Sequence, residues 1–225
     1  MALLMLVIEP VGLIAAARTI SFRSPSGRTV EASLNESSQR PAPAVVLVGM
    51  LGHSRDDWQA IAQRLADARI TTLAIDLPSA VAPDSADALA SWSDDVRGAV
   101  SYLAARSETR AGAVGVLGAS LGASLAVVAA SGDAQVRSLA LISPTSDYRG
   151  LRIENALRQF GARPAYLVAS RLDPYAARSV RELAKNPPGV REVQMAEAAA
   201  SGTLLLTREP DLVRLVIEWF QRTLG

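Results

Sequence analysis

The chain has 225 residues, enough for a single domain with a sizeable buried core. Hydrophobic residues make up 49% of the chain and charged residues 20%, which excludes a disordered protein. The net charge is +1 and the basic residues form no run, so we expect a small neutral ligand and no nucleic acid. Because there is no cysteine and only one histidine, His53, the sequence excludes disulfides, thiolate catalysis and multi-histidine metal sites. We therefore expect no metal and no cofactor.

The first 18 residues form an apolar segment. Small residues at 15–17 resemble a signal-peptidase site, but no basic residue precedes them, and Glu9-Pro10 interrupts the run. The segment is too short and too broken to span a membrane. It is either the remnant of a signal peptide or a buried N-terminal segment, so both a cytoplasmic and an exported bacterial protein remain open. We place the folded domain at residues 19–225.

The domain opens with strands. Two short strand-like runs, 19–23 and 29–34, flank a turn-forming Ser-Pro-Ser-Gly and predict an antiparallel hairpin. The run 44–48 is continuously apolar and ends at Gly49, as is typical of a strand buried on both faces.

From this strand onward, helices alternate with strands. Ser54 is placed as the N-cap of a helix with Trp58, Ile61 and Leu65 on one face. Further strands are predicted at 71–75, 113–117, 138–142, 165–169 and 190–195, and further helices at 88–106, 121–130, 175–185 and 211–224. This alternation predicts an α/β fold: a doubly wound, mainly parallel sheet of about eight strands flanked by helices.

The most informative motif is Gly118-Ala119-Ser120-Leu121-Gly122, a G-x-S-x-G sequence between a predicted buried strand and a predicted helix. In this context the turn strains the serine backbone, and both glycines allow close backbone approach, which exposes the serine hydroxyl above the sheet. A glycine-rich turn at this place can also hold a phosphate, but G-x-G-x-x-G is absent. The motif therefore predicts Ser120 as a nucleophile, with a purely structural turn as the alternative.

With this motif the chain resembles the α/β-hydrolase superfamily, and within it the small dienelactone-hydrolase-like serine esterases, over roughly residues 19–225. The resemblance implies an oxyanion site formed by the backbone N–H groups of Leu121 and of Met50, in the loop 48–54. The histidine that relatives often carry at the start of this loop is missing.

The resemblance also implies a catalytic acid just past the strand 165–169, where this chain has Asp173-Pro174. Asp173 is the expected acid. An aspartate followed by proline is also an ordinary helix start, so the same side chain is a candidate N-cap, and the two roles can coexist. The stretch Ser143-Pro144 and residues 147–150 follow the preceding strand, as in relatives where this stretch borders the pocket. Tyr148 there is a candidate for either a structural role or a substrate contact.

The general base is where the chain departs from the family. Relatives place a histidine after the last strand, between a small residue and Gly-Thr, and here Ser201-Gly202-Thr203 puts a serine in that position. A serine hydroxyl does not titrate near neutral pH and cannot accept and return the nucleophile's proton. His53, in the oxyanion loop, is the alternative base. A natural loss of the histidine and a deliberate replacement of it would both give the same sequence, with serine at position 201.

Two functions follow. The first is a serine hydrolase acting on small carboxylic esters or lactones through Ser120, impaired because Ser201 stands in the histidine position. The alternative is a non-catalytic member of the fold that keeps a binding pocket. A nucleotide-dependent enzyme lacks a phosphate-binding motif. Only about twenty residues, 143–164, separate two strands between which lid domains are usually inserted, so we expect no large lid.

Overall fold

The computed structural model describes residues 17–185 and 188–225. Its main sheet has eight strands in the order β1-β2-β4-β3-β5-β6-β9-β10. The strands are β1 (Arg18–Arg23), β2 (Thr29–Asn35), β3 (Ala42–Val48), β4 (Thr71–Ile75), β5 (Thr109–Ala119), β6 (Val136–Ile142), β9 (Ala165–Ser170) and β10 (Arg191–Ala196). A separate two-stranded ribbon pairs β7 (Asp147–Tyr148) with β8 (Leu151–Arg152).

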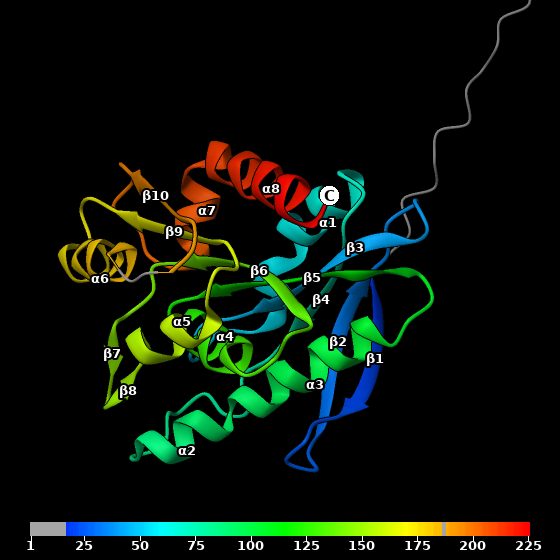
Figure 1. Cartoon of the computed structure of the whole chain (residues 1–225), viewed down its shortest axis with the longest axis horizontal. Helices are drawn as coiled ribbons and strands as arrows, with labels where there is room; N and C mark the ends of the chain where they lie inside the picture. Colours follow the sequence, from blue (N-terminus) through cyan, green and yellow to red (C-terminus); the bar gives the residue numbers. More distant parts are fainter. Residues whose placement is uncertain (1–16, 186–187) are drawn as a thin grey trace, which may run out of the picture.

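Helices cover both faces of the main sheet (Figure 1). They are the 3-10 helix η1 (Arg55–Trp58), α1 (Gln59–Asp67), α2 (Ala86–Ser91), α3 (Ser93–Ala104), α4 (Leu121–Ser131), α5 (Glu154–Phe160), α6 (Pro174–Ala184), α7 (Thr203–Arg208) and α8 (Pro210–Leu224). One core cluster joins α2 to α6 with one sheet face, and a second joins α1, α7 and α8 with the other. The protein is thus a doubly wound α/β sheet, as predicted.

The sheet is parallel from β4 to β10, and its first part is antiparallel. β1 pairs antiparallel with β2, and β2 pairs antiparallel with β4, while the other neighbours run parallel. Every residue of β3, β4 and β9 is buried, which is why these strands appear in the sequence as apolar runs. Because the parallel strands run in one direction, the loops after β3, β5, β6, β9 and β10 meet at one edge of the sheet.

The predicted start of the first helix is confirmed. The Ser54 hydroxyl accepts a hydrogen bond from the Asp56 N–H at 3.1 Å, as an N-cap does, although the first turn is a 3-10 helix that continues into α1. Trp58, Ile61 and Leu65 are buried together against the sheet. One apolar face thus fixes this helix to the sheet.

Other elements differ from the prediction. The single helix predicted at 88–106 is two helices, α2 and α3, which meet at Trp92. The short helix α7 was not predicted. The segment 143–164 holds only the ribbon β7–β8 and the helix α5, so it contains no large lid, as expected. Of the apolar segment 1–18, residues 1–16 lie outside the described residues, and Arg18 already belongs to β1.

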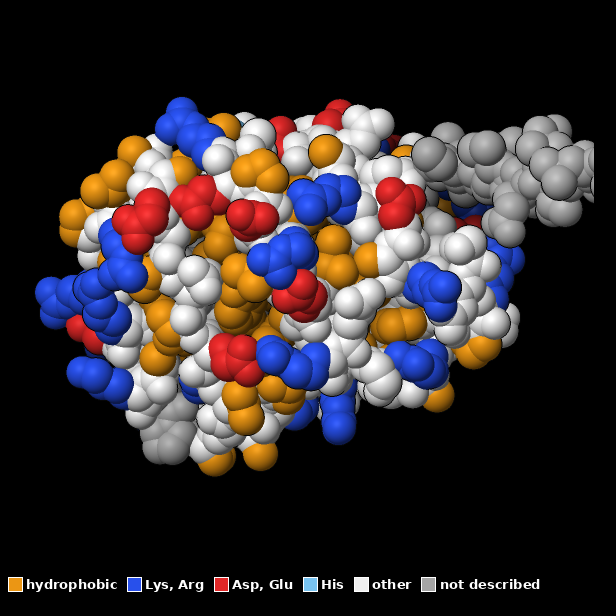
Figure 2. All heavy atoms as spheres, turned by 90° about the horizontal axis from the view of Figure 1, so that it is seen from above, with side chains coloured by type: hydrophobic (Ala, Val, Ile, Leu, Met, Phe, Trp, Pro, Cys, Tyr) orange, Lys and Arg blue, Asp and Glu red, His pale blue; other side chains and the backbone are white. Residues whose placement is uncertain are grey.

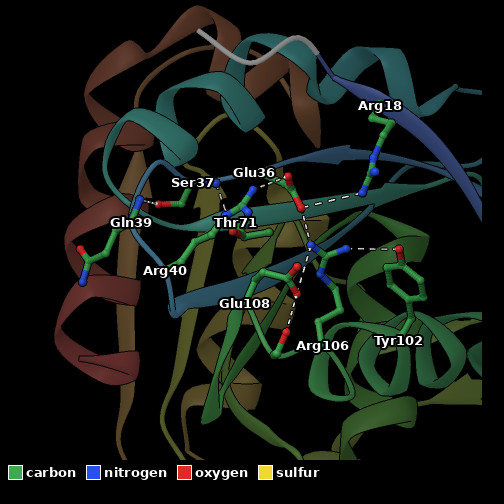
Figure 3. A network of polar contacts seen from close by, with 10 residues as sticks. Arg18, Glu36, Ser37, Gln39, Arg40, Thr71, Tyr102, Arg106 and Glu108 are labelled. Carbon is green, nitrogen blue, oxygen red and sulfur yellow. Dashed lines mark hydrogen bonds and ion pairs between the residues drawn. The ribbon is translucent and has the colours of Figure 1, made fainter. Parts of the chain in front are cut away.

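A network of polar contacts lies at the end of the sheet opposite to the loops that follow the parallel strands (Figure 3). The Glu36 carboxylate, just after β2, forms ion pairs with Arg40 at 2.8 Å and with Arg18 at 3.8 Å. It also pairs with Arg106, which precedes β5. Burial and the hydrogen bond to Tyr102 act in opposite directions on the pKa of Arg106, and the net direction is upward. The network joins the hairpin to the central strands, so it stabilises the sheet at the edge remote from Ser120.

No helix within residues 17–185 and 188–225 has the length and apolar character needed to cross a membrane.

Candidate active site

Ser120 lies at the turn between β5 and α4 with a strained backbone. Its φ and ψ are 52° and −120°, a combination that non-glycine residues rarely adopt. The Ser120 N–H donates to the Ile142 carbonyl at 2.9 Å, which fixes the turn to the end of β6. The side chain is half-buried, and its hydroxyl makes no hydrogen bond to any residue that the structure describes. The serine is therefore held rigidly with a free hydroxyl.

Both glycines of the motif are required by close backbone contacts. A Cβ on Gly118 would lie 2.5 Å from the Gly122 carbonyl oxygen and 2.7 Å from the Ala123 backbone. A Cβ on Gly122 would lie 2.5 Å from the Val48 carbonyl oxygen and would also collide with that of Gly49. The first turn of α4 thus packs directly onto the end of β3.

This contact brings together the two expected oxyanion donors. Leu121 is the neighbour of Gly122, and Met50 is the neighbour of Gly49, so the Gly122–Gly49 contact places both backbone segments side by side. Within the described chain, neither the Leu121 N–H nor the Met50 N–H donates a hydrogen bond to another residue. Two unpaired donors near a serine hydroxyl are what an oxyanion site requires.

Asp173 follows β9 and caps α6. Its Oδ1 accepts a hydrogen bond from the Ala176 N–H at 3.0 Å, so the N-cap role expected from the sequence is present. A second acid, Asp147, follows β6. It accepts from Arg152 Nε at 2.9 Å, and this bond, with one from the Gly150 N–H, lowers the pKa of its carboxyl. Asp147 is thereby committed to a surface ion pair, whereas Asp173 is not.

Ser201 lies in the loop between β10 and α7, and its neighbour Gly202 ties that loop to β6. Gly202 has a φ of 59°, and its N–H donates to the Ser143 hydroxyl at 3.0 Å. Ser201 itself is exposed, and the Met50 side chain packs against the Gly202 backbone. The loop that carries Ser201 and the loop that carries Met50 are therefore in contact.

The same loop is fixed at its other end by residues that the sequence analysis did not identify as functional. The Ser170 hydroxyl donates to the Ala198 carbonyl at 2.6 Å and accepts from the Leu172 N–H at 3.0 Å, which joins this loop to the Asp173 loop. Glu209 Oε1 accepts from the Glu197 N–H at 2.6 Å. The available sequence signal was a serine at the carboxyl end of a buried strand, as in Ser143 and Ser170.

His53, the alternative base, pairs with a carboxylate of the neighbouring helix. His53 Nδ1 lies 2.6 Å from Asp57 Oδ2, and both side chains are about two-fifths exposed. No hydrogen bond joins the His53 ring to Ser120. The loop that contains Met50 is close to Ser120, but its histidine engages a neighbouring helix instead.

Two exposed apolar side chains lie on or next to the loops that carry Asp173 and Ser201. Leu172, beside Asp173, is 63% exposed, and Leu204, just after the Ser201 loop, is 48% exposed. A cavity of about 230 Å³ lies elsewhere, between β2 and α1, with Asn35, Arg55 and Trp58 in its lining. The edge of the sheet that carries Ser120 is thus open and partly apolar.

Charges are interspersed over the face that carries α8. Figure 2 shows basic and acidic side chains side by side there, with apolar side chains between them and no large patch of one sign. Within the described residues, no group of three His, Cys, Asp or Glu side chains is placed to hold a metal ion.

Comparisons with known proteins agree with this fold. The model of the alpha/beta hydrolase family matches residues 44–221. A dienelactone hydrolase from Anabaena variabilis is 21% identical with a TM-score of 0.76, over 94% of this chain and 100% of that one. An esterase domain from Rhodothermus marinus is 16% identical with a TM-score of 0.72, over 93% of this chain and 100% of that one.

A third solved structure, an esterase from Pyrococcus furiosus, is 14% identical with a TM-score of 0.74, over 93% of this chain and 92% of that one. At these identities the solved structures show the fold alone. A comparison with curated proteins found no match. Because the family model covers well over half of the chain, the protein belongs to the alpha/beta hydrolase family.

Proposed function

We propose that this protein is a serine hydrolase-like protein for small carboxylic esters or lactones, with Ser120 as its nucleophile and with weak turnover because it lacks a general base. The observation that carries the proposal is the Ser120 turn itself: a strained serine with a free hydroxyl, next to the unpaired N–H groups of Met50 and Leu121. Such donors stabilise the oxyanion that forms when a serine attacks an ester carbonyl.

Each loop would contribute one part of the reaction. Ser120 Oγ adds to the carbonyl carbon, and the Met50 and Leu121 N–H groups hold the resulting oxyanion. Asp173 is the acid that would orient a base in the Ser201 position. Ser201 cannot act as that base, since its hydroxyl does not titrate near pH 7. The exposed Leu172 and Leu204 side chains favour an apolar acyl or alkyl group, and the absence of a large lid favours small substrates.

A non-catalytic binding function is the second candidate. It is favoured by one specific observation: His53, the only histidine of the chain, is paired with Asp57 and makes no hydrogen bond to Ser120. In this case the Ser120 pocket would bind a small carboxylic ester or related ligand without turning it over.

Release of p-nitrophenol from p-nitrophenyl butyrate separates these functions. We would compare the parent protein with Ser120→Ala, Ser201→His and the matched control Ser201→Ala. A positioned general base contributes about 10²–10⁴-fold to rate, so we expect Ser201→His to gain activity by about that factor. Ser201→Ala should leave the rate unchanged.

Two results decide the matter. A parent rate above that of Ser120→Ala establishes a working nucleophile, and an equal rate supports the binding function. If Ser201→His folds normally but gains nothing, Ser201 does not stand in the position of the base, and the proposal that a missing histidine there limits turnover fails.

A further inference from the structure

The Asp173 carboxylate has no cationic partner. Among the described residues, no arginine, lysine or histidine nitrogen lies within ion-pair distance of it. The two arginines nearest in sequence on the same loop and helix are engaged elsewhere: Arg171 with Glu197 at 2.6 Å, and Arg178 with Glu182 at 2.8 Å. In the part of the chain that the structure describes, the capping bond from the Ala176 N–H is the one hydrogen bond of the Asp173 side chain. A carboxylate with unused acceptor capacity favours a neighbouring N–H donor, and it stabilises the cation that forms when such a group takes up a proton.

The loop that carries Ser201 is bonded to the loop that carries Asp173, through the Ser170 hydroxyl. Ser201 is exposed and lacks the ring that a histidine would place there. Its loop does not depend on such a ring for its position, because the Ser143–Gly202 and Ser170–Ala198 hydrogen bonds fix it to β6 and β9. Ser120 Oγ is likewise without a partner. The site thus retains nucleophile, acid and loop, and lacks only a basic nitrogen.

From these contacts we propose that the ligand supplies that nitrogen. The preferred substrate class is an ester whose acyl group carries an imidazole or a weakly basic amine, which binds against Asp173 and accepts the proton of Ser120. This inference rests on the proposed function, since it uses Ser120 as the nucleophile and Asp173 as the acid.

The reaction balances with the ligand nitrogen as the only base. The nitrogen accepts the Ser120 Oγ proton as Oγ bonds to the carbonyl carbon. The bond to the alcohol oxygen then breaks, and the nitrogen returns its proton to the leaving alkoxide. In the second half the nitrogen accepts a proton from water as the hydroxyl adds to the acyl carbon. The bond to Oγ breaks, and the proton returns to Ser120.

The position of the nitrogen in the substrate therefore matters. A nitrogen in the acyl group stays on the protein through both halves and permits turnover. A nitrogen in the alcohol leaves after the first half, so the acyl group remains on Ser120. This difference gives the proposal a readout that a merely favourable charge contact would not produce.

The experiment uses the full chain with three esters at pH 7.5: ethyl 3-(imidazol-4-yl)propanoate, its neutral counterpart ethyl 3-phenylpropanoate, and 2-(imidazol-4-yl)ethyl 3-phenylpropanoate. Acid product is measured by chromatography, and the mass of the intact protein is recorded. We expect the parent to hydrolyse the acyl-imidazole ester at least about a hundredfold faster than the neutral ester, the lower end of general-base effects. The third ester should leave the mass of one phenylpropanoyl group on the protein.

Variants identify the residues responsible. Ser120→Ala should abolish both the turnover and the mass increase. Asp173→Asn keeps an N-cap of equal quality for α6 while it removes the charge, so it should fold and lose most of the preference. Ser201→His should hydrolyse the neutral ester and lose the preference, because its own ring fills the place.

The outcomes separate the two levels of the argument. If Ser201→His hydrolyses the neutral ester and the parent treats the imidazole and neutral esters alike, the proposed function stands and the ligand-borne base is overturned. If folded Ser201→His and the parent are both inactive on all three esters, both proposals fail. A preference that survives in Asp173→Asn also contradicts the inference.

Discussion

The Ser143 hydroxyl accepts a hydrogen bond from the Gly202 N–H at 3.0 Å, and this bond joins the end of β6 to the loop that carries Ser201. Ser143 is only 2% exposed, and its own N–H donates to the Val168 carbonyl of β9 at 2.7 Å. One serine therefore holds together three strands' ends around the candidate active site. Its side chain is a structural determinant of where any base on the Ser201 loop would lie.

Ser143→Ala should destabilise the protein by about 1–3 kcal/mol, because it leaves the buried Gly202 N–H without an acceptor. The free energy of unfolding in urea measures the loss. Ser91→Ala is the matched control: its exposed hydroxyl donates to the Ala88 carbonyl, and its removal should cost little. Ser143→Ala should also reduce the activity gained by Ser201→His. A loss no larger than that of Ser91→Ala would show that the Ser143–Gly202 bond does not hold the loop.

Gly122→Ala should destabilise the fold and damage the Ser120 turn together. The added methyl group would meet the Val48 and Gly49 carbonyl oxygens, which are backbone atoms and cannot rotate away. Overpacking of this kind costs about 1–3 kcal/mol. Gly132→Ala, at the other end of α4 with nothing within 4 Å of the new methyl group, is the control, and thermal unfolding is the measurement. Equal melting temperatures for the two variants would contradict the close packing of α4 on β3.

Arg28→Met should be strongly destabilising, because Arg28 in the first hairpin pairs with Asp95, a side chain on α3 that is 4% exposed. Removing one partner of a buried pair costs about 3–5 kcal/mol, and we expect the lower end because Arg28 is itself 39% exposed. Adding Asp95→Leu should recover much of the loss. Arg214→Met, which breaks an exposed pair with Glu218, should cost under about 1 kcal/mol in the same urea titration. If Arg28→Met and Arg214→Met lose similar free energies of unfolding, the buried Arg28–Asp95 pair is no more important to stability than an exposed one.

Tyr166 should make the fold sensitive to alkaline pH. Its ring stacks on Trp219 with centroids 5.3 Å apart, and burial raises its pKa from 10.0 to about 12. Since the folded-state pKa is the higher one, the folded protein holds the phenolic proton more tightly than the unfolded chain does. This contribution to stability is complete below pH 10 and is lost as the pH rises toward 12.

Tyr166→Phe removes the titrating group and no hydrogen bond to a described residue. The variant should match the parent in stability at pH 7. Between pH 9 and 11, about one unit either side of the ordinary tyrosine pKa, it should lose less stability than the parent does. Thermal unfolding at each pH measures the difference. Parallel stability curves for the two proteins would rule out Tyr166 as the source of the pH dependence.

The sequence predicted those features that depend on neighbouring residues. Fully buried strands such as β3 and β9 appear as apolar runs, and Ser54 marks the start of the first helix by its own side chain. The strained Ser120 turn was predictable for the same reason, since its two glycines lie within the same short motif. The capping role of Asp173 followed from the proline next to it.

The tertiary structure alone determined the elements and contacts that distant residues create. The short helices α5 and α7 have too few residues to be stable alone, and they form because Phe160 and Leu205 are buried in the two cores. The Ser143–Gly202 and Ser170–Ala198 bonds join residues far apart in the chain, which only the parallel order β6-β9-β10 brings to one edge. His53 differs in kind: its partner Asp57 is only four residues away, but the sequence did not show that the first turn of the helix would bring these two side chains together.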